Sequence, residues 1–89
     1  MKPIKQSALF RRHYRERIAH DDRLVEQFQA AVEAFLHDPA LADDHWLTGK
    51  QTGKAAFSIN EDYRVTYLDQ PDYFLFFDVG THEQVYQRR

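Results

Sequence analysis

Two side chains in the second half of the sequence have types and positions that suit chemistry on a charged substrate. Arg64 lies inside a short strand-like segment, where a guanidinium is costly unless it pairs with a carboxylate or faces a ligand. His82 follows Gly80 by two residues, just past the end of another strand-like segment. Histidine changes its protonation state near neutral pH and suits general acid–base catalysis, although most loop histidines have no such role. Two roles therefore remain open for Arg64, as part of an anion-binding site or as one partner of a structural ion pair.

Charged residues are distributed in blocks along the chain. The net charge is −2, but residues 1–18 hold six basic side chains against one acidic, and residues 19–45 hold seven acidic against one basic. A polyanion could bind the basic block, and a solvated helix face explains it equally well. The sequence has no cysteine, which excludes a disulfide and a thiolate nucleophile. No metal site or cofactor is expected, because the helical histidines lack ligand spacing: His13, His20 and His37.

The first element expected to support these residues is a helix that begins after Ser7. Serine is a favourable N-cap, and Phe10, Tyr14 and Ile18 recur at the helical spacing of one apolar stripe. Residues 3–6 before it fit a short strand or an extended arm. The opposite side of this helix is expected to lie in water, and it carries Arg11, Arg12, His13 and Arg15.

A second helix is expected after Asp21 or Asp22, either of which could serve as its N-cap. The apolar residues over 24–35 keep the spacing of a core-facing stripe. Asp38-Pro39 is expected to end the helix, because proline disfavours helical geometry in the residue before it. The short connection between the two helices predicts an antiparallel helical hairpin.

After Ala55 the apolar pattern changes to a period of two, which predicts three strands over 55–60, 63–68 and 73–79, separated by turns. The third is apolar on both faces, which favours a central position in the sheet, and Gly80 is expected to end it. In 89 residues this order predicts one α+β domain, with the helix pair on one face of an antiparallel meander. The register is left open, and a slip by one residue would exchange the two faces.

Several short motifs occur in a fixed order: His-Trp-Leu-Thr-Gly-Lys at 45–50, Phe-Ser-Ile-Asn at 57–60, Tyr-Arg-Val at 63–65, and a run at 77–86 that contains Val-Gly-Thr-His and ends in Val-Tyr. This set resembles the RelE/StbE- and YafQ-type toxins of bacterial type II toxin–antitoxin systems, in the RelE/ParE superfamily. The resemblance implies a RelE-like α+β fold over residues 1–89. In it, an N-terminal strand and an antiparallel helical hairpin pack on a small, mainly antiparallel sheet.

The same resemblance implies an activity. Toxins of this kind enter the ribosomal A site and cleave the mRNA there, by attack of the ribose 2′-OH on the neighbouring phosphate. The reaction needs a proton acceptor, a cation on the phosphate and a proton donor for the leaving 5′-oxygen. We therefore expect a cytoplasmic, metal-independent endoribonuclease (an mRNA interferase) whose partners are the ribosome, mRNA and a cognate antitoxin. The antitoxin would cover the basic helix or the sheet face, in a complex that could oligomerise, with no membrane partner.

Five residues match catalytic positions of these toxins. The resemblance makes Arg64 the phosphate-binding arginine, His82 the histidine of a Gly-x-His motif, and Tyr86 an aromatic used in acid–base work or base stacking. His45 matches an active-site histidine, and Asp62 matches the aspartate of an Asp-Trp pair. A structural role for Tyr86, with its ring packed at the edge of the sheet, is nearly as well supported by the sequence.

Four residues are candidates for substrate binding. Tyr63 stands where the Asp-Trp pair has its tryptophan. Trp46 could stack on a base, although a place over the core suits it better. Lys50 and Lys54 could contact phosphate, but lysines in a polar connector are more often only solvated.

Two positions depart from the pattern of the toxins. Ser58 stands where YafQ-like proteins have a second histidine, and Asp78 stands where they have an arginine before Gly-x-His. A carboxylate at position 78 would repel a phosphate unless it orients Arg64 or His82. Two alternatives therefore stay open. One is a ParE-like toxin that inhibits DNA gyrase by binding and needs no His45/His82/Tyr86 set, and the other is a catalytically degenerate relative.

Overall fold

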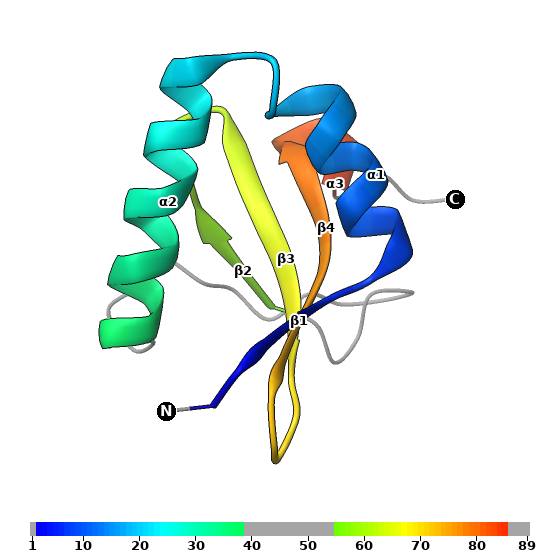
Figure 1. Cartoon of the computed structure of the whole chain (residues 1–89), viewed down its shortest axis with the longest axis vertical. Coiled ribbons are helices and arrows are strands. Elements are labelled where there is room, and N and C mark those ends of the chain that lie inside the picture. The colour runs from blue at the N-terminus through cyan, green and yellow to red at the C-terminus, as the bar shows by residue number, and fades with distance from the viewer. Residues whose placement is uncertain (1, 39–54, 86–89) are drawn as a thin grey trace.

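The computed structural model describes residues 2–38 and 55–85 of the chain. Four strands form one sheet in the order β1-β4-β3-β2, in which β1 runs parallel to β4 and the other neighbours are antiparallel (Figure 1). The α+β class, the mainly antiparallel sheet and the inner position of the last strand are confirmed. In chain order the elements are β1 (Ile4–Gln6), α1 (Ala8–Arg17), α2 (Asp22–His37), β2 (Ala55–Ser58), β3 (Tyr63–Asp69), β4 (Phe74–Thr81) and α3 (His82–Val85).

Both long helices begin at side-chain caps. The Ser7 hydroxyl accepts a hydrogen bond from the Phe10 amide at 2.9 Å, and the Asp21 carboxylate accepts from the amides of Arg23 and Leu24 at 3.0 and 3.2 Å. Such caps satisfy amides that have no partner within the helix. A short turn joins the helices into the expected hairpin, with α1 beside β4 and α2 beside β2 (Figure 1).

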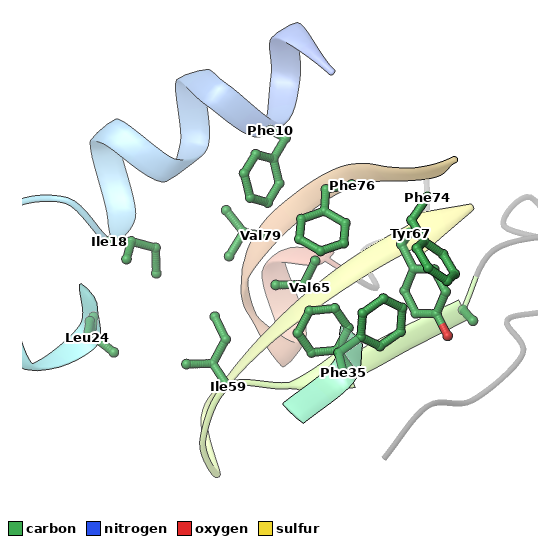
Figure 2. Packing of buried hydrophobic residues seen from close by; sticks show 12 residues of the cluster. Phe10, Ile18, Leu24, Phe35, Ile59, Val65, Tyr67, Phe74, Phe76 and Val79 are labelled. Carbon is green, nitrogen blue, oxygen red and sulfur yellow. The ribbon is translucent and has the colours of Figure 1, made fainter. Parts of the chain in front are cut away.

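The core is built around Phe35 of α2. Its ring stacks on Phe57 of β2 with 4.6 Å between centroids. It also meets Tyr67 and Phe74 edge-on, each at 4.8 Å (Figure 2). Phe10 of α1 joins the same cluster through Phe76, at 5.6 Å. Burying each of these side chains contributes about 1.5–3 kcal/mol. One apolar cluster therefore holds both helices on the same face of the sheet.

A β-bulge in β4 changes which side chains face the helices. Tyr67 of β3 pairs with Phe76, but Thr66 pairs with Asp78, so Phe77 is an extra residue in β4. The extra residue shifts the alternation by one position. Val79 therefore joins Phe76 in the core, and Asp78 falls on the opposite face beside Thr66.

Gly80 does not end the last strand, contrary to the expectation from sequence. The strand continues through Gly80 to Thr81, and Gly80 pairs with Arg64 of β3. A Cβ atom at position 80 would lie 2.5 Å from the Gln84 Oε1 atom and 2.6 Å from the Arg17 Nη1 atom. A larger residue here would have to displace the ends of these two side chains, which lie directly over the Gly80 backbone.

The N-terminal end of α1 and its last turn cover one edge of β4. Strand β1 pairs only with the first part of β4, up to Phe76. Beyond it the Ser7 amide donates to the Phe76 carbonyl at 3.0 Å, the Ser7 hydroxyl to the Phe77 carbonyl at 2.7 Å, and the Arg17 guanidinium to the Val79 carbonyl at 2.8 Å. These bonds satisfy edge groups that would otherwise be open to pairing with another chain.

The short helix α3 packs against β3 and β4 and lies behind β4 in the view of Figure 1. The sequence analysis did not predict this helix. Val85 on α3 is buried, as are Ala56 and Thr66 on the sheet face that points away from α1 and α2. Within residues 2–38 and 55–85, no helix is long and apolar enough to cross a membrane.

Candidate active site

Arg64 occupies the centre of the candidate site. It lies between Ser58 of β2 and Gly80 of β4, its direct partners in the sheet. The residue is half-buried, and its Nη1 atom donates a hydrogen bond to the Ser58 hydroxyl. Ser58, which departs from the toxin pattern, therefore fixes the orientation of the guanidinium that the pattern assigns to phosphate.

Two more of the predicted residues, Asp62 and His82, lie at the same end of the sheet as Arg64, whereas the Tyr63 side chain packs against the core on the opposite face. The His82 amide donates to the Asp62 carbonyl at 3.1 Å, and Tyr63 pairs with Thr81. The turn before β3 is shaped by Asn60, whose side-chain oxygen accepts from the amides of Asp62 and Tyr63 at 2.8 and 2.9 Å. The side chains of Asp62 and His82 are exposed, so both are open to a substrate.

Asp78 has partners that the sequence analysis did not foresee. Its Oδ1 atom lies 2.6 Å from the His13 Nδ1 atom and 3.7 Å from the Arg17 Nη1 atom, and it accepts from the Val79 amide at 2.7 Å. The carboxylate thus orients groups of α1, not Arg64 or His82. The side chains of His13 and Asp78 are only 17% and 11% exposed.

The expectation that His13 would lie in water is wrong. Helix α1 runs along the edge of β4, so His13 and Arg17, one turn apart, both face that edge. The four-residue spacing of these two cationic types was a visible signal. It could be interpreted only together with the bulge at Phe77, which turns Asp78 toward them.

Five predicted site residues lie outside the part of the chain that the structure describes, namely His45, Trp46, Lys50, Lys54 and Tyr86. Their roles stay predictions. In residues 2–38 and 55–85 no group of three or more histidine, aspartate and glutamate side chains could hold a metal ion.

The basic block of residues 1–18 does not form one surface. Lys2 bonds to Asp69 near the turn between β3 and β4, and Lys5 lies over the ring of Tyr73. Arg12 pairs with Glu16 on the exposed side of α1, at 3.3 Å. A separate hollow of about 370 Å³ has an aromatic floor and a cationic rim, and its lining is Gln6, Phe10, Arg11, Tyr14, Arg15 and Phe28.

Solved structures share this fold, although no family model and no curated protein matches the sequence. The YoeB/ParE toxin from Agrobacterium tumefaciens is 19% identical with a TM-score of 0.73, over 92% of this chain and 99% of that one. A chain of the Escherichia coli DinJ-YafQ complex is 18% identical with a TM-score of 0.70, over 97% and 99%. A chain of the YoeB-YefM toxin-antitoxin heterotetramer from Staphylococcus aureus is 18% identical with a TM-score of 0.72, over 92% and 98%. At these identities the likeness establishes a common fold.

Proposed function

We propose that this chain, which has the fold of the YafQ and YoeB proteins, is the toxin of a type II toxin–antitoxin pair and cleaves mRNA on the ribosome. The shared fold extends over more than nine-tenths of the chain, but a fold does not specify an activity. The proposal therefore depends on the site. A function on ribosomes would place the protein in the cytoplasm.

One observation carries the proposal, which is the arrangement around Arg64. A guanidinium offers several donors in a planar fork that matches a phosphate, and the bond to Ser58 sets the plane of that fork. Gly80, its partner in β4, lies under the side chains of Arg17 and Gln84, which brings a second guanidinium beside the partner of Arg64. Asp62 and His82 stand at the same end of the sheet. This shared end of the sheet supports the assignment of these groups to attack by a 2′-OH.

The direct test is cleavage of a defined mRNA in a purified translation reaction. We expect new 5′ ends when ribosomes are present, and the upstream fragment should carry a 2′,3′-cyclic phosphate. Arg64→Ala should reduce cleavage by about 100-fold or more, because the developing negative charge loses its cation. Arg64→Lys keeps the positive charge but lacks the planar fork, so its cleavage rate should lie between those of the wild type and Arg64→Ala.

The alternative function is that of a toxin that binds DNA gyrase. It stays a candidate because one matched structure carries the name ParE. Growth arrest with intact mRNA and altered DNA supercoiling would establish it and overturn the nuclease proposal. A chain that affects neither mRNA nor supercoiling would be a degenerate relative.

We also propose a site for the antitoxin, namely the hollow between α1 and α2. Two of the matched structures are complexes of a toxin with its antitoxin. Arg11 and Arg15 on the rim complement acidic side chains, and the rings of Phe10, Tyr14 and Phe28 can receive an apolar one. The expected occupant is an acidic antitoxin segment with an apolar anchor.

A further inference from the structure

Asp78 poses a chemical problem for an RNA-binding site. The residue lies on the same sheet face as Arg64, two positions away across the β3–β4 pairing, so a bound phosphate would lie close to its negative charge. The carboxylate is nine-tenths buried, accepts hydrogen bonds from His13 and the Val79 amide, and has the Arg17 guanidinium 3.7 Å away as an ion-pair partner. A buried carboxylate with this many donors has a positioning role, and the question is which group it positions.

We propose that His13 of α1 is the general base of the RNA-cleavage site and that Asp78 is its positioning residue. This inference rests on the proposed nuclease function. An ionised carboxylate can only accept hydrogen bonds, so the His13 Nδ1 atom at 2.6 Å must carry the proton. The other ring nitrogen, Nε2, is then the one that can accept a proton. The pairing of a histidine with a carboxylate fixes both the tautomer and the ring orientation.

The position of His13 fits this role. Asp78 pairs directly with Thr66, and Arg64 is two residues further along β3 on the same face, which corresponds to about 7 Å. The Arg17 Nη1 atom lies 2.6 Å from the place that a Cβ atom of Gly80 would take and 3.7 Å from the Asp78 carboxylate, and Gly80 is the partner of Arg64. His13 and Arg17 of α1 thus contact β4 next to the strand position that pairs with Arg64.

The positive charge of Arg17 also offsets the negative charge of Asp78. Its guanidinium donates to the Val79 carbonyl at 2.8 Å and lies 3.7 Å from Asp78. The positive charge that the toxin pattern has at position 78 is here supplied by the neighbouring helix. A phosphate bound by Arg17 and Arg64 would face two positive charges, while the carboxylate of Asp78 is buried against its own partners.

The reaction balances with groups on this surface. The Nε2 atom of His13 takes the proton of the ribose 2′-OH while the 2′-oxygen bonds to phosphorus. The bond from phosphorus to the 5′-oxygen breaks, and the 5′-oxygen takes a proton from a protonated His82. The products are a 2′,3′-cyclic phosphate and a 5′-hydroxyl. Both histidines return to their starting states by exchanging one proton with water.

The competing role is purely structural, since the ion pair fastens α1 to β4. His13→Asn separates the two roles, because an asparagine amide can donate to Asp78 from nearly the same place as Nδ1 but cannot act as a base. We expect His13→Asn to unfold at nearly the wild-type temperature and to cleave about 100-fold more slowly. The control is His20→Asn, which changes an exposed histidine at the end of the α1–α2 turn and should leave cleavage unchanged.

Two further readouts are specific to a base. The wild-type rate in single-turnover cleavage should fall as the pH is lowered and the base is protonated, and His13→Asn should lose this limb of the profile. Added imidazole should restore part of the activity of His13→Gly and none in His20→Gly. Asp78→Asn should slow cleavage by roughly 10-fold or more, and the low-pH limb of its pH–rate profile should be displaced from that of the wild type.

Wild-type cleavage together with an unchanged rate and pH profile in His13→Asn would overturn this inference and leave the proposed function standing. Absence of cleavage by the wild-type chain on ribosomes would overturn both. If His13→Asn fails to fold, imidazole rescue of His13→Gly decides, and lack of rescue in a folded His13→Gly counts against the base role.

Discussion

At the residue scale, Ser58 is a departure from the toxin motif that contacts the candidate site directly. The toxin pattern has a histidine at this position, whereas the serine hydroxyl found here cannot act as a general acid or base near neutral pH. It accepts a hydrogen bond from Arg64 instead, across the β2–β3 pairing. The site thus replaces a group that could react with one that orients its neighbour.

Ser58→Ala tests this reading. Removal of the acceptor should weaken the positioning of the Arg64 fork and reduce RNA cleavage by about 10-fold, because misplacement of a charged group weakens its effect in the transition state. Stability should change by about 1 kcal/mol or less, the usual net contribution of one hydrogen bond. Ser58→Thr keeps the hydroxyl and should cleave at close to the wild-type rate. Full activity of Ser58→Ala in the ribosome assay would show that the bond to Arg64 has no catalytic consequence.

At the element scale, α1 and α2 differ in what they contribute. Helix α2 supplies Phe35, the centre of the core, and its role is stability. Helix α1 supplies Phe10 to the same core, but its other flank covers the β4 edge and delivers His13 and Arg17 to the far face of the sheet. One helix therefore connects the core to the candidate site.

The cap of α2 provides a prediction at this scale. The sequence allows Asp21 or Asp22 as the cap, and the structure shows that the Asp21 carboxylate accepts from the amides of Arg23 and Leu24. Asp21→Ala should lower the free energy of unfolding by about 1 kcal/mol. Asp22→Ala should cost less, roughly 0.3–1 kcal/mol, since it removes only a charge near the helix N-terminus. Urea unfolding of both variants measures the difference, and a larger loss for Asp22→Ala would contradict the assignment.

At the scale of the whole molecule, the two proposed surfaces lie on opposite sides of the sheet. RNA would contact the face that carries Arg64 and Asp78, whereas the hollow for the antitoxin lies between the helices. Substitutions on the rim of the hollow should therefore affect the antitoxin and spare the chemistry.

Arg15→Glu tests that separation. A glutamate on the rim would repel the acidic antitoxin segment and should weaken binding of the cognate antitoxin by at least about 10-fold. The remaining affinity should depend less on the salt concentration. RNA cleavage by the free toxin should be unchanged. Arg12→Glu is the matched control, because Arg12 faces away from the hollow and pairs with Glu16. Equal weakening by both variants would point to a general charge effect and would reject the hollow as the binding site.

Much of the secondary structure could be predicted because its signals are local. Ser7 and the Asp21–Asp22 pair mark helix starts through bonds that span two or three residues, and Asp38-Pro39 marks a stop. Alternation predicted that Val65 and Tyr67 would share one face of their strand, and the structure shows that this face is the core. The motif set also made Arg64, Asp62 and His82 candidates for the site, and in the structure these three lie at one end of the sheet.

The sequence by itself determined the order and type of the main elements, the apolar face of each, and the resemblance that directed attention to Arg64 and His82. Only the tertiary structure decided that β4 has an extra residue at Phe77, that it continues through Gly80, and that Asp78 meets His13. Caps and alternation depend on neighbours in the chain. A bulge depends on the register between two strands, and the contact of His13 with Asp78 joins residues 65 positions apart. Such contacts depend on how whole elements pack, and no local pattern encodes them.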